Sequence, residues 1–163
     1  MTFLAIDPGR DTGWAVLRED GILSSCGLGD PPLAFNGHRV LVERPQIYRG
    51  RASKADPNDL ITLAIQVGRY KERFMSRGCS VEEIIPHTWK GTVDPDVLCN
   101  RIVSSLTDDE RCVLDSALLS VAKSKQHNVI DAVGLGKWSV HRSRAAVFHV
   151  FSSRQALASS RDG

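Results

Sequence analysis

The sequence lacks any long apolar run, and this absence argues against a protein that crosses a membrane through a helix. No hydrophobic stretch approaches the roughly 20 residues that a membrane-spanning helix needs. The N-terminus also has no basic segment ahead of its first apolar residues, as a secretory signal peptide would have. We therefore expect the chain to act in the cytoplasm, with no membrane partner.

Cysteines are few and widely spaced, which argues against a zinc site. The four cysteines form no CxxC pair and no pattern with histidine of the kind that holds zinc. We expect all four to be reduced and mostly buried. They are Cys26, Cys79, Cys99 and Cys112.

A strong charge of one sign is also missing, since the formal net charge is only +2. The basic residues are nevertheless unevenly distributed, with concentrations in residues 39–54 and in the tail from Lys137. Such stretches are commonly solvated surface, but beside a carboxylate site they indicate a phosphate-bearing partner. The 163 residues are enough for one domain with an ordinary core.

Short apolar runs separated by Gly and Pro predict an α/β fold. Residues 3–6 and 14–17 flank a Pro-Gly turn and predict a hairpin whose first strand is central in the sheet. Further strands are expected at residues 21–28, 40–43 and 81–85, and helices at 57–77, 95–106, 107–121 and 128–138. The order predicts a mixed five-stranded sheet flanked by helices. We expect residues 1–141 to form this domain and residues 142–163 to form a basic, partly disordered extension.

Three carboxylates stand out against this pattern. Asp7 and Glu43 each end an apolar strand, and Asp131 lies in an apolar helix, three residues after Asn128 and on the same helical face. An acid in such surroundings needs a cation or a basic partner. Hard oxygen ligands suit Mg²⁺ or Mn²⁺, and two such ions about 4 Å apart can promote phosphodiester hydrolysis. The alternatives are that Asp7 only begins the turn, and that Asp131 pairs with a neighbouring lysine or backbone group.

Four segments in this order resemble the RuvC family of Holliday-junction resolvases, phage members in particular. They are AIDPGRDTGWAVL, VLVERPQ, IIPHTWKG and HNVIDAVGLGKW, and the resemblance covers roughly residues 3–140. It implies an RNase H-like fold and a crossover junction endodeoxyribonuclease. It also implies a homodimer that nicks opposing strands of branched DNA symmetrically.

The resemblance also implies a catalytic and metal-binding set. Asp7, Glu43, Asn128 and Asp131 would hold two Mg²⁺ ions, for which Mn²⁺ would substitute. The family usually has Asp at the position of Asn128, so His127 is a possible additional ligand. Asn128 could instead cap the helix.

A second departure from the family is the short distance between the first two acids. The 36 positions from Asp7 to Glu43 leave no room for the helix that the family has between its third and fourth strands. We expect the sheet edge to be covered differently in this chain.

Candidates for DNA contact follow from the same resemblance. Lys90, at a strand end, resembles family lysines that contact the scissile phosphate, and otherwise it is a solvated loop residue. The other candidates lie in the loop where the family meets the junction, namely Tyr48, Arg49, Arg51 and Lys54. Tyr48 could stack on a base. Two other functions remain open at this point: another nuclease of this fold that acts on flaps, forks or RNA–DNA hybrids, and a junction-binding module that does not cut.

Overall fold

The computed structural model describes residues 1–32, 34–35, 37–46 and 56–159, and from residue 143 onward it describes the backbone alone. The proposed DNA contacts Tyr48, Arg49, Arg51 and Lys54 therefore lie outside the described residues. The strands are β1 (Thr2–Asp7), β2 (Gly13–Arg18), β3 (Leu23–Leu28), β4 (Arg39–Glu43) and β5 (Ser80–Ile84). The helices are α1 (Pro57–Met75), α2 (Pro86–Lys90), α3 (Pro95–Ser104), α4 (Asp108–Leu118) and α5 (Gln126–Ser159), with a 3-10 turn η1 (Lys123–Lys125) before α5.

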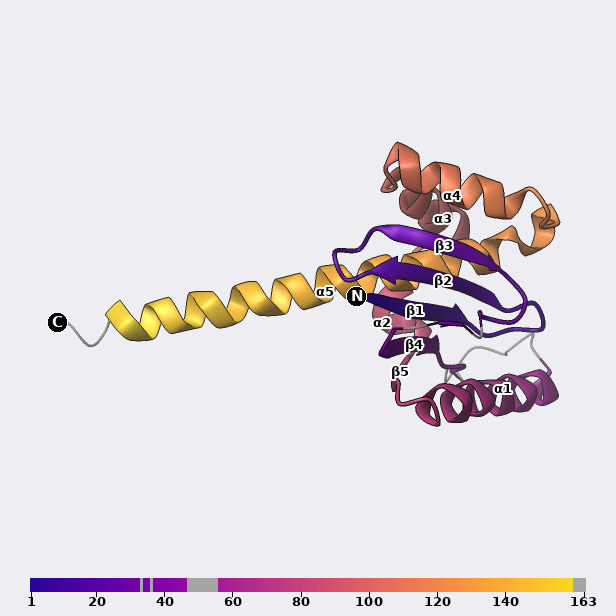
Figure 1. Ribbon diagram of the computed structural model, residues 1–163, viewed down its shortest axis with the longest axis horizontal. Helices are drawn as coiled ribbons and strands as arrows, with labels where there is room; N and C mark the ends of the chain where they lie inside the picture. Colours follow the sequence, from indigo (N-terminus) through magenta and orange to yellow (C-terminus); the bar gives the residue numbers. More distant parts are fainter. Residues whose placement is uncertain (33, 36, 47–55, 160–163) are drawn as a thin grey trace.

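The five strands form one mixed sheet in the order β3-β2-β1-β4-β5, which confirms the predicted class. Strand β1 is central, as its apolar run predicted, and it pairs antiparallel with β2 and parallel with β4. Strand β5 adds to β4 in parallel. Helix α1 covers one face of the sheet, and α3, α4 and α5 lie on the other (Figure 1).

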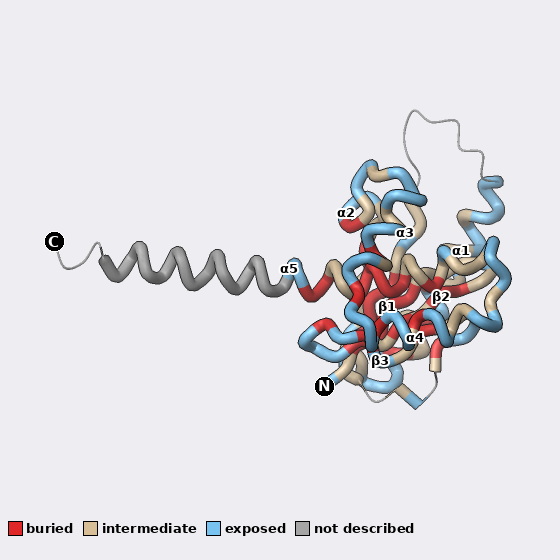
Figure 2. Tube along the Cα trace, turned by 90° about the horizontal axis from the view of Figure 1, so that it is seen from above, coloured by how far each residue is buried: buried red, intermediate tan, exposed pale blue. Residues whose placement is uncertain are grey.

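Alternate residues of β1 enter two separate hydrophobic cores, as the period of two in a strand requires. Phe3 and Ala5 pack on the side of α3, α4 and α5, whereas Leu4 and Ile6 pack on α1 together with Phe74. All five residues are almost completely buried, and the buried segments converge on the sheet in Figure 2. Strand β1 is therefore the shared wall between the two cores.

Helix α5 approaches the sheet closely because glycine faces it. A Cβ built on Gly13 of β2 would lie 1.9 Å from the carbonyl oxygen of Asn128, at the start of α5. Further along the helix, a Cβ on Gly136 would lie 2.3 Å from the side chain of Leu17. The absence of a side chain at Gly136 therefore permits close packing of the helix on β2. A Cβ on Gly134 would instead meet the side chains of Ile102 and Trp89.

Two buried polar groups connect the layers. Glu110 forms a capping box at the start of α4 with Thr107, accepts a 2.7 Å hydrogen bond from the backbone of Leu23 and pairs with Lys137 of α5. On the other face, the Thr12 hydroxyl accepts hydrogen bonds from Gln66 and Tyr70 of α1 at 2.8 and 3.0 Å. The turn after Asp7 is thereby attached to α1.

The helices differ from the predicted ones at two places, and the segment between β3 and β4 agrees with its prediction. The last helix does not end near Trp138 but continues to Ser159, because no Gly or Pro interrupts the sequence between Gly136 and Gly163. Residues 86–90, for which the sequence predicted no helix or strand, form the short helix α2, with Pro86 in its first turn. Between β3 and β4, the residues that the structure describes contain no helix, as the short spacing predicted. In the described part of the chain, no helix has the length and apolar character needed to cross a membrane.

We predict that Gly13→Ala lowers the free energy of unfolding by about 1–3 kcal/mol, the usual cost of overpacking. The added methyl group cannot fit without moving the start of α5. Gly68→Ala is the matched control, because a Cβ there meets nothing within 4 Å and alanine favours a helix by about 1 kcal/mol. Urea unfolding of the three proteins measures both effects. Equal stability of Gly13→Ala and wild type would contradict the close contact between α5 and β2.

Candidate active site

Asp7 and Glu43 lie side by side at the same edge of the sheet. They end the parallel strands β1 and β4, whose register pairs Ile6 with Val42 one residue earlier. Ile6 and Val42 both point into the core beneath α1. Because side chains alternate along a strand, Asp7 and Glu43 both point to the opposite face, where α5 lies.

Helix α5 brings the third carboxylate to this edge. Asp7 pairs with Gly13 across the hairpin, and Gly13 is the residue on which the backbone of Asn128 rests. Asp131 follows Asn128 by three residues in the same helix, as the sequence predicted, and both are half-buried. His127 is exposed. The close contact at Gly13 thus determines where Asp131 meets the two strand-end acids.

A lysine and a tryptophan from α2 complete the cluster. The Lys90 ammonium lies 2.8 Å from Oδ2 of Asp131 and 3.2 Å from each of the two carboxylate oxygens of Glu43. The Trp89 indole Nε1 donates a 2.7 Å hydrogen bond to Oε2 of Glu43. Glu43 is therefore held by two donors from adjacent residues, and Lys90 bridges Glu43 and Asp131.

Burial and like charge dominate the electrostatics of the cluster. Burial, followed by the charge of Glu43, raises the pKa of Asp7 well above its usual value; Asp131 adds to the effect and Lys90 opposes it. Burial also raises the pKa of Glu43, against the lowering effect of Lys90 and Trp89. Burial would lower the pKa of Lys90, but the neighbouring carboxylates outweigh it, Glu43 first, and raise that pKa. Lys90 therefore remains an ammonium at neutral pH.

The donor set fits a divalent cation in chemistry. Carboxylate oxygens from three elements are the hard ligands that Mg²⁺ and Mn²⁺ prefer, and three acids in a confined space need positive charge between them. Within the described residues, however, no three His, Cys, Asp or Glu side chains are already grouped as metal ligands. The cation that bridges Glu43 and Asp131 is Lys90.

The structure brings four of the predicted site residues together, and it shows one further residue, Trp89, in contact with them. Asp7, Glu43, Asp131 and Lys90 come together. Trp89 is not among the site residues predicted from the sequence, but it is both buried and a hydrogen-bond donor to Glu43. No pattern in the sequence marked this second role, because the contact depends on how α2 turns back over the ends of β4 and β5.

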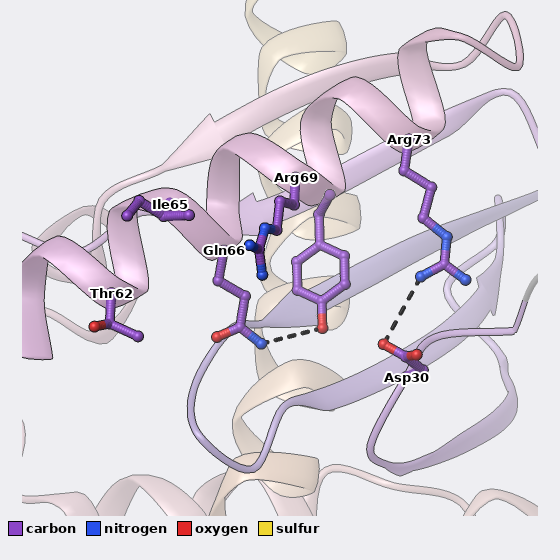
Figure 3. Close-up of a pocket in the computed structure, with 7 residues that line it drawn as sticks. Asp30, Thr62, Ile65, Gln66, Arg69 and Arg73 are labelled. Atoms are coloured by element: carbon purple, nitrogen blue, oxygen red, sulfur yellow. Dashed lines mark hydrogen bonds and ion pairs between the residues drawn. The ribbon is translucent and has the colours of Figure 1, made fainter.

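A separate pocket of about 490 Å³ lies on the other face of the sheet, along α1. Figure 3 shows Gln66, Arg69 and Arg73 on this helix, with Arg73 pointing to Asp30 across the opening; their ion pair measures 3.8 Å. Gln66 also hydrogen-bonds Thr12, so the pocket adjoins the turn after Asp7. None of the site residues predicted from the sequence lines it.

Comparison with known proteins supports the fold. No protein-family model and no curated protein matches the sequence. Among solved structures, the chain is similar to T. thermophilus RuvC in complex with a Holliday junction substrate, with a TM-score of 0.50 and 15% identity over 89% of this chain and 96% of that one. A second Thermus thermophilus RuvC structure has a TM-score of 0.46 and 17% identity over 90% and 97% of the two chains. The mixed sheet with its flanking helices is the RNase H-like fold of RuvC.

We predict that Asp7→Asn stabilises the metal-free protein at neutral pH. The raised pKa means that the folded state binds a proton at Asp7 more tightly than the unfolded chain does. Wild-type stability therefore falls as pH rises above the usual value of 3.8, and the full cost is present above the folded-state pKa. The asparagine variant avoids this cost.

The check is denaturant unfolding in EDTA at several pH values. The advantage of Asp7→Asn should shrink as the pH falls toward 3.8. Asp11→Asn is the control, because Asp11 pairs with Lys125 on a partly exposed surface and should change stability by at most about 1 kcal/mol. An Asp7→Asn protein that is less stable than wild type at pH 7 would contradict the prediction.

Proposed function

We propose that the protein is a divalent-metal-dependent endonuclease that cuts branched DNA, with four-way junctions as the preferred substrate. The observation that carries the proposal is the convergence of Asp7, Glu43 and Asp131 with Lys90 at one edge of an RNase H-like sheet. The solved RuvC to which the chain is similar is bound to a Holliday junction substrate. We place the reaction among crossover junction endodeoxyribonucleases, acting in DNA recombination and repair in the cytoplasm.

Asp7, Glu43 and Asp131 would hold the metal, two Mg²⁺ ions with Mn²⁺ as a substitute, and Asn128 or His127 would complete the ligands. A metal at this position supplies Lewis-acid stabilisation of charge on the phosphodiester and lowers the pKa of water. Asn128 can offer its carbonyl oxygen but no charge, so it would bind less strongly than a carboxylate there.

The chain's own residues orient and shield these groups. The 2.7 Å hydrogen bond from Trp89 fixes Oε2 of Glu43, and Oε1 accepts a hydrogen bond from Lys90. The side chains of Glu43 and Asp131 are only 12% and 15% exposed, so little water competes for their oxygens. Such desolvation strengthens the attraction between these carboxylates and a bound cation. For the DNA strands themselves we propose contacts from Arg49, Arg51 and Lys54, with stacking by Tyr48 and a phosphate contact by Lys90.

Symmetric cutting of a junction needs two sites, and we propose a homodimer. Helix α1 supports this, because Ile61 and Ile65 are 58% and 53% exposed one helical turn apart.

We predict that Ile61→Lys combined with Ile65→Lys shifts sedimentation from dimer to monomer. Leu119→Lys is the control, since Leu119 is 89% exposed at the end of α4 and should leave the dimer intact. A monomeric wild type at micromolar concentration would contradict the dimer.

The decisive experiment is cleavage of a labelled mobile four-way junction, with duplex, flap and RNA–DNA hybrid controls. We predict paired symmetric nicks that require Mg²⁺. Asp7→Asn should lose more than about a hundred-fold in rate, at least the scale seen when groups that support a metal are removed, while still binding the junction. Asp11→Asn, an acid of the same turn outside the cluster, should cut like wild type. Cutting by Asp7→Asn at the wild-type rate would overturn the assignment.

A junction-binding module that does not cut is the second candidate. The bridge from Lys90 to Glu43 and Asp131 favours it, because the cluster already has a cation. Tight junction binding with no nick in Mg²⁺ or Mn²⁺ would establish this candidate. Preference for flaps, forks or hybrids would keep the metal site and change the substrate.

A further inference from the structure

Lys90 forms ion pairs with two carboxylates of the cluster, whereas a lysine that only contacted DNA phosphate would need neither. Its ammonium contacts Asp131 at 2.8 Å and both oxygens of Glu43 at 3.2 Å, and the charge of Asp7 also acts on it. Its side chain is 24% exposed. A side chain of the protein itself therefore supplies positive charge that offsets the negative charge of this cluster.

The local fold holds Lys90 at this position. Helix α2 begins at Pro86 and ends at Lys90, and it is capped by Gly91, whose φ of +62° is a conformation that glycine adopts without strain. Trp89 is buried and donates to Glu43, so the preceding residue is fixed on the same carboxylate. The Lys90 ammonium also lies 4.9 Å from the centre of the Trp89 ring, a cation–π distance.

We propose that Lys90 is a built-in counter-ion that occupies the carboxylate cluster until a divalent cation displaces it. Lys90 thereby sets the cation affinity of the site. This inference rests on the proposed metal-dependent function, and it concerns how that site is regulated. Two of the three carboxylates already pair with this ammonium.

Displacement follows from charge and reach. An ammonium and a divalent cation repel each other strongly at contact distance, and they compete for the same oxygens of Glu43 and Asp131. A lysine side chain can leave without moving the helix that carries it, because its charge sits on a flexible four-carbon stem. The exposed quarter of the Lys90 side chain provides the direction of exit toward solvent, where a DNA phosphate is an alternative partner.

The test is Mn²⁺ affinity, measured without DNA from the electron paramagnetic resonance signal of free Mn²⁺. We expect Lys90→Gln to bind Mn²⁺ at least about tenfold more tightly than wild type, which is about 1.4 kcal/mol. Lys90→Arg keeps the charge and should stay within about threefold of wild type. Lys125→Gln is the matched control, because it removes an equal charge outside the cluster. Lys125 pairs at 2.7 Å with Asp11, which lies in the turn after Asp7, and its loss should change the Mn²⁺ affinity little.

A second measurement uses wild-type protein alone, in case Lys90→Gln does not fold. Reductive methylation followed by mass spectrometry reports how accessible each lysine is. Mg²⁺ should increase the labelling of Lys90 severalfold, because the displaced side chain enters solvent, and should leave Lys125 unchanged.

The outcomes separate this inference from the proposed function. Mn²⁺ binding that is equal or weaker in folded Lys90→Gln, or Lys90 labelling that does not rise with Mg²⁺, would overturn the counter-ion role and leave the metal site standing. Absence of Mn²⁺ binding in every variant would overturn both. Tighter Mn²⁺ binding in Lys90→Gln, together with no DNA cutting by the wild type, would support the counter-ion role and contradict the nuclease.

Discussion

Asp7, Glu43 and Asp131 carry like charges, and the fold holds them within interaction distance at one edge of a sheet. Packing elsewhere must supply the free energy for this arrangement, because burial and neighbouring negative charge raise the pKa values of Asp7 and Glu43. The apolar face of α5 supplies much of it, with Val129, Ala132, Val133 and Leu135 fully buried on either side of Asp131. The site therefore depends on the apolar packing of α5, which offsets the electrostatic repulsion among the three acids.

The sequence was sufficient for those features that depend on local periodicity. An apolar run ended by an acid predicted that Asp7 and Glu43 close their strands, and a spacing of three predicted that Asn128 and Asp131 share a helical face. The capping box at Thr107 was also readable, because its two hydrogen bonds join residues three apart. Each of these signals lies within one element, so no knowledge of the tertiary fold was needed.

What escaped prediction depends on contacts between distant elements. The hydrogen bond from Trp89 to Glu43 spans 46 positions, and the bridge from Lys90 to Asp131 spans 41. These contacts follow from the parallel pairing of β4 with β5, which places α2 over the acids, and no periodicity encodes that pairing. The close packing of α5 on Gly13 was likewise not predictable. A glycine next to a turn suggests only that the backbone needs conformational freedom there, and the fold is needed to show that a helix packs against it.

The division of β1 between two cores has an evolutionary consequence. Leu4 and Ile6 face α1, while Phe3 and Ala5 face α3, α4 and the helix α5 that carries Asp131, so the sheet separates the two sets of contacts. Effects of mutations that share no partner usually add, and substitutions on α1 should therefore combine almost independently with substitutions around the acids. A lineage could exchange the surface that α1 presents, and with it the choice of partner, while the chemistry on the opposite face is inherited unchanged.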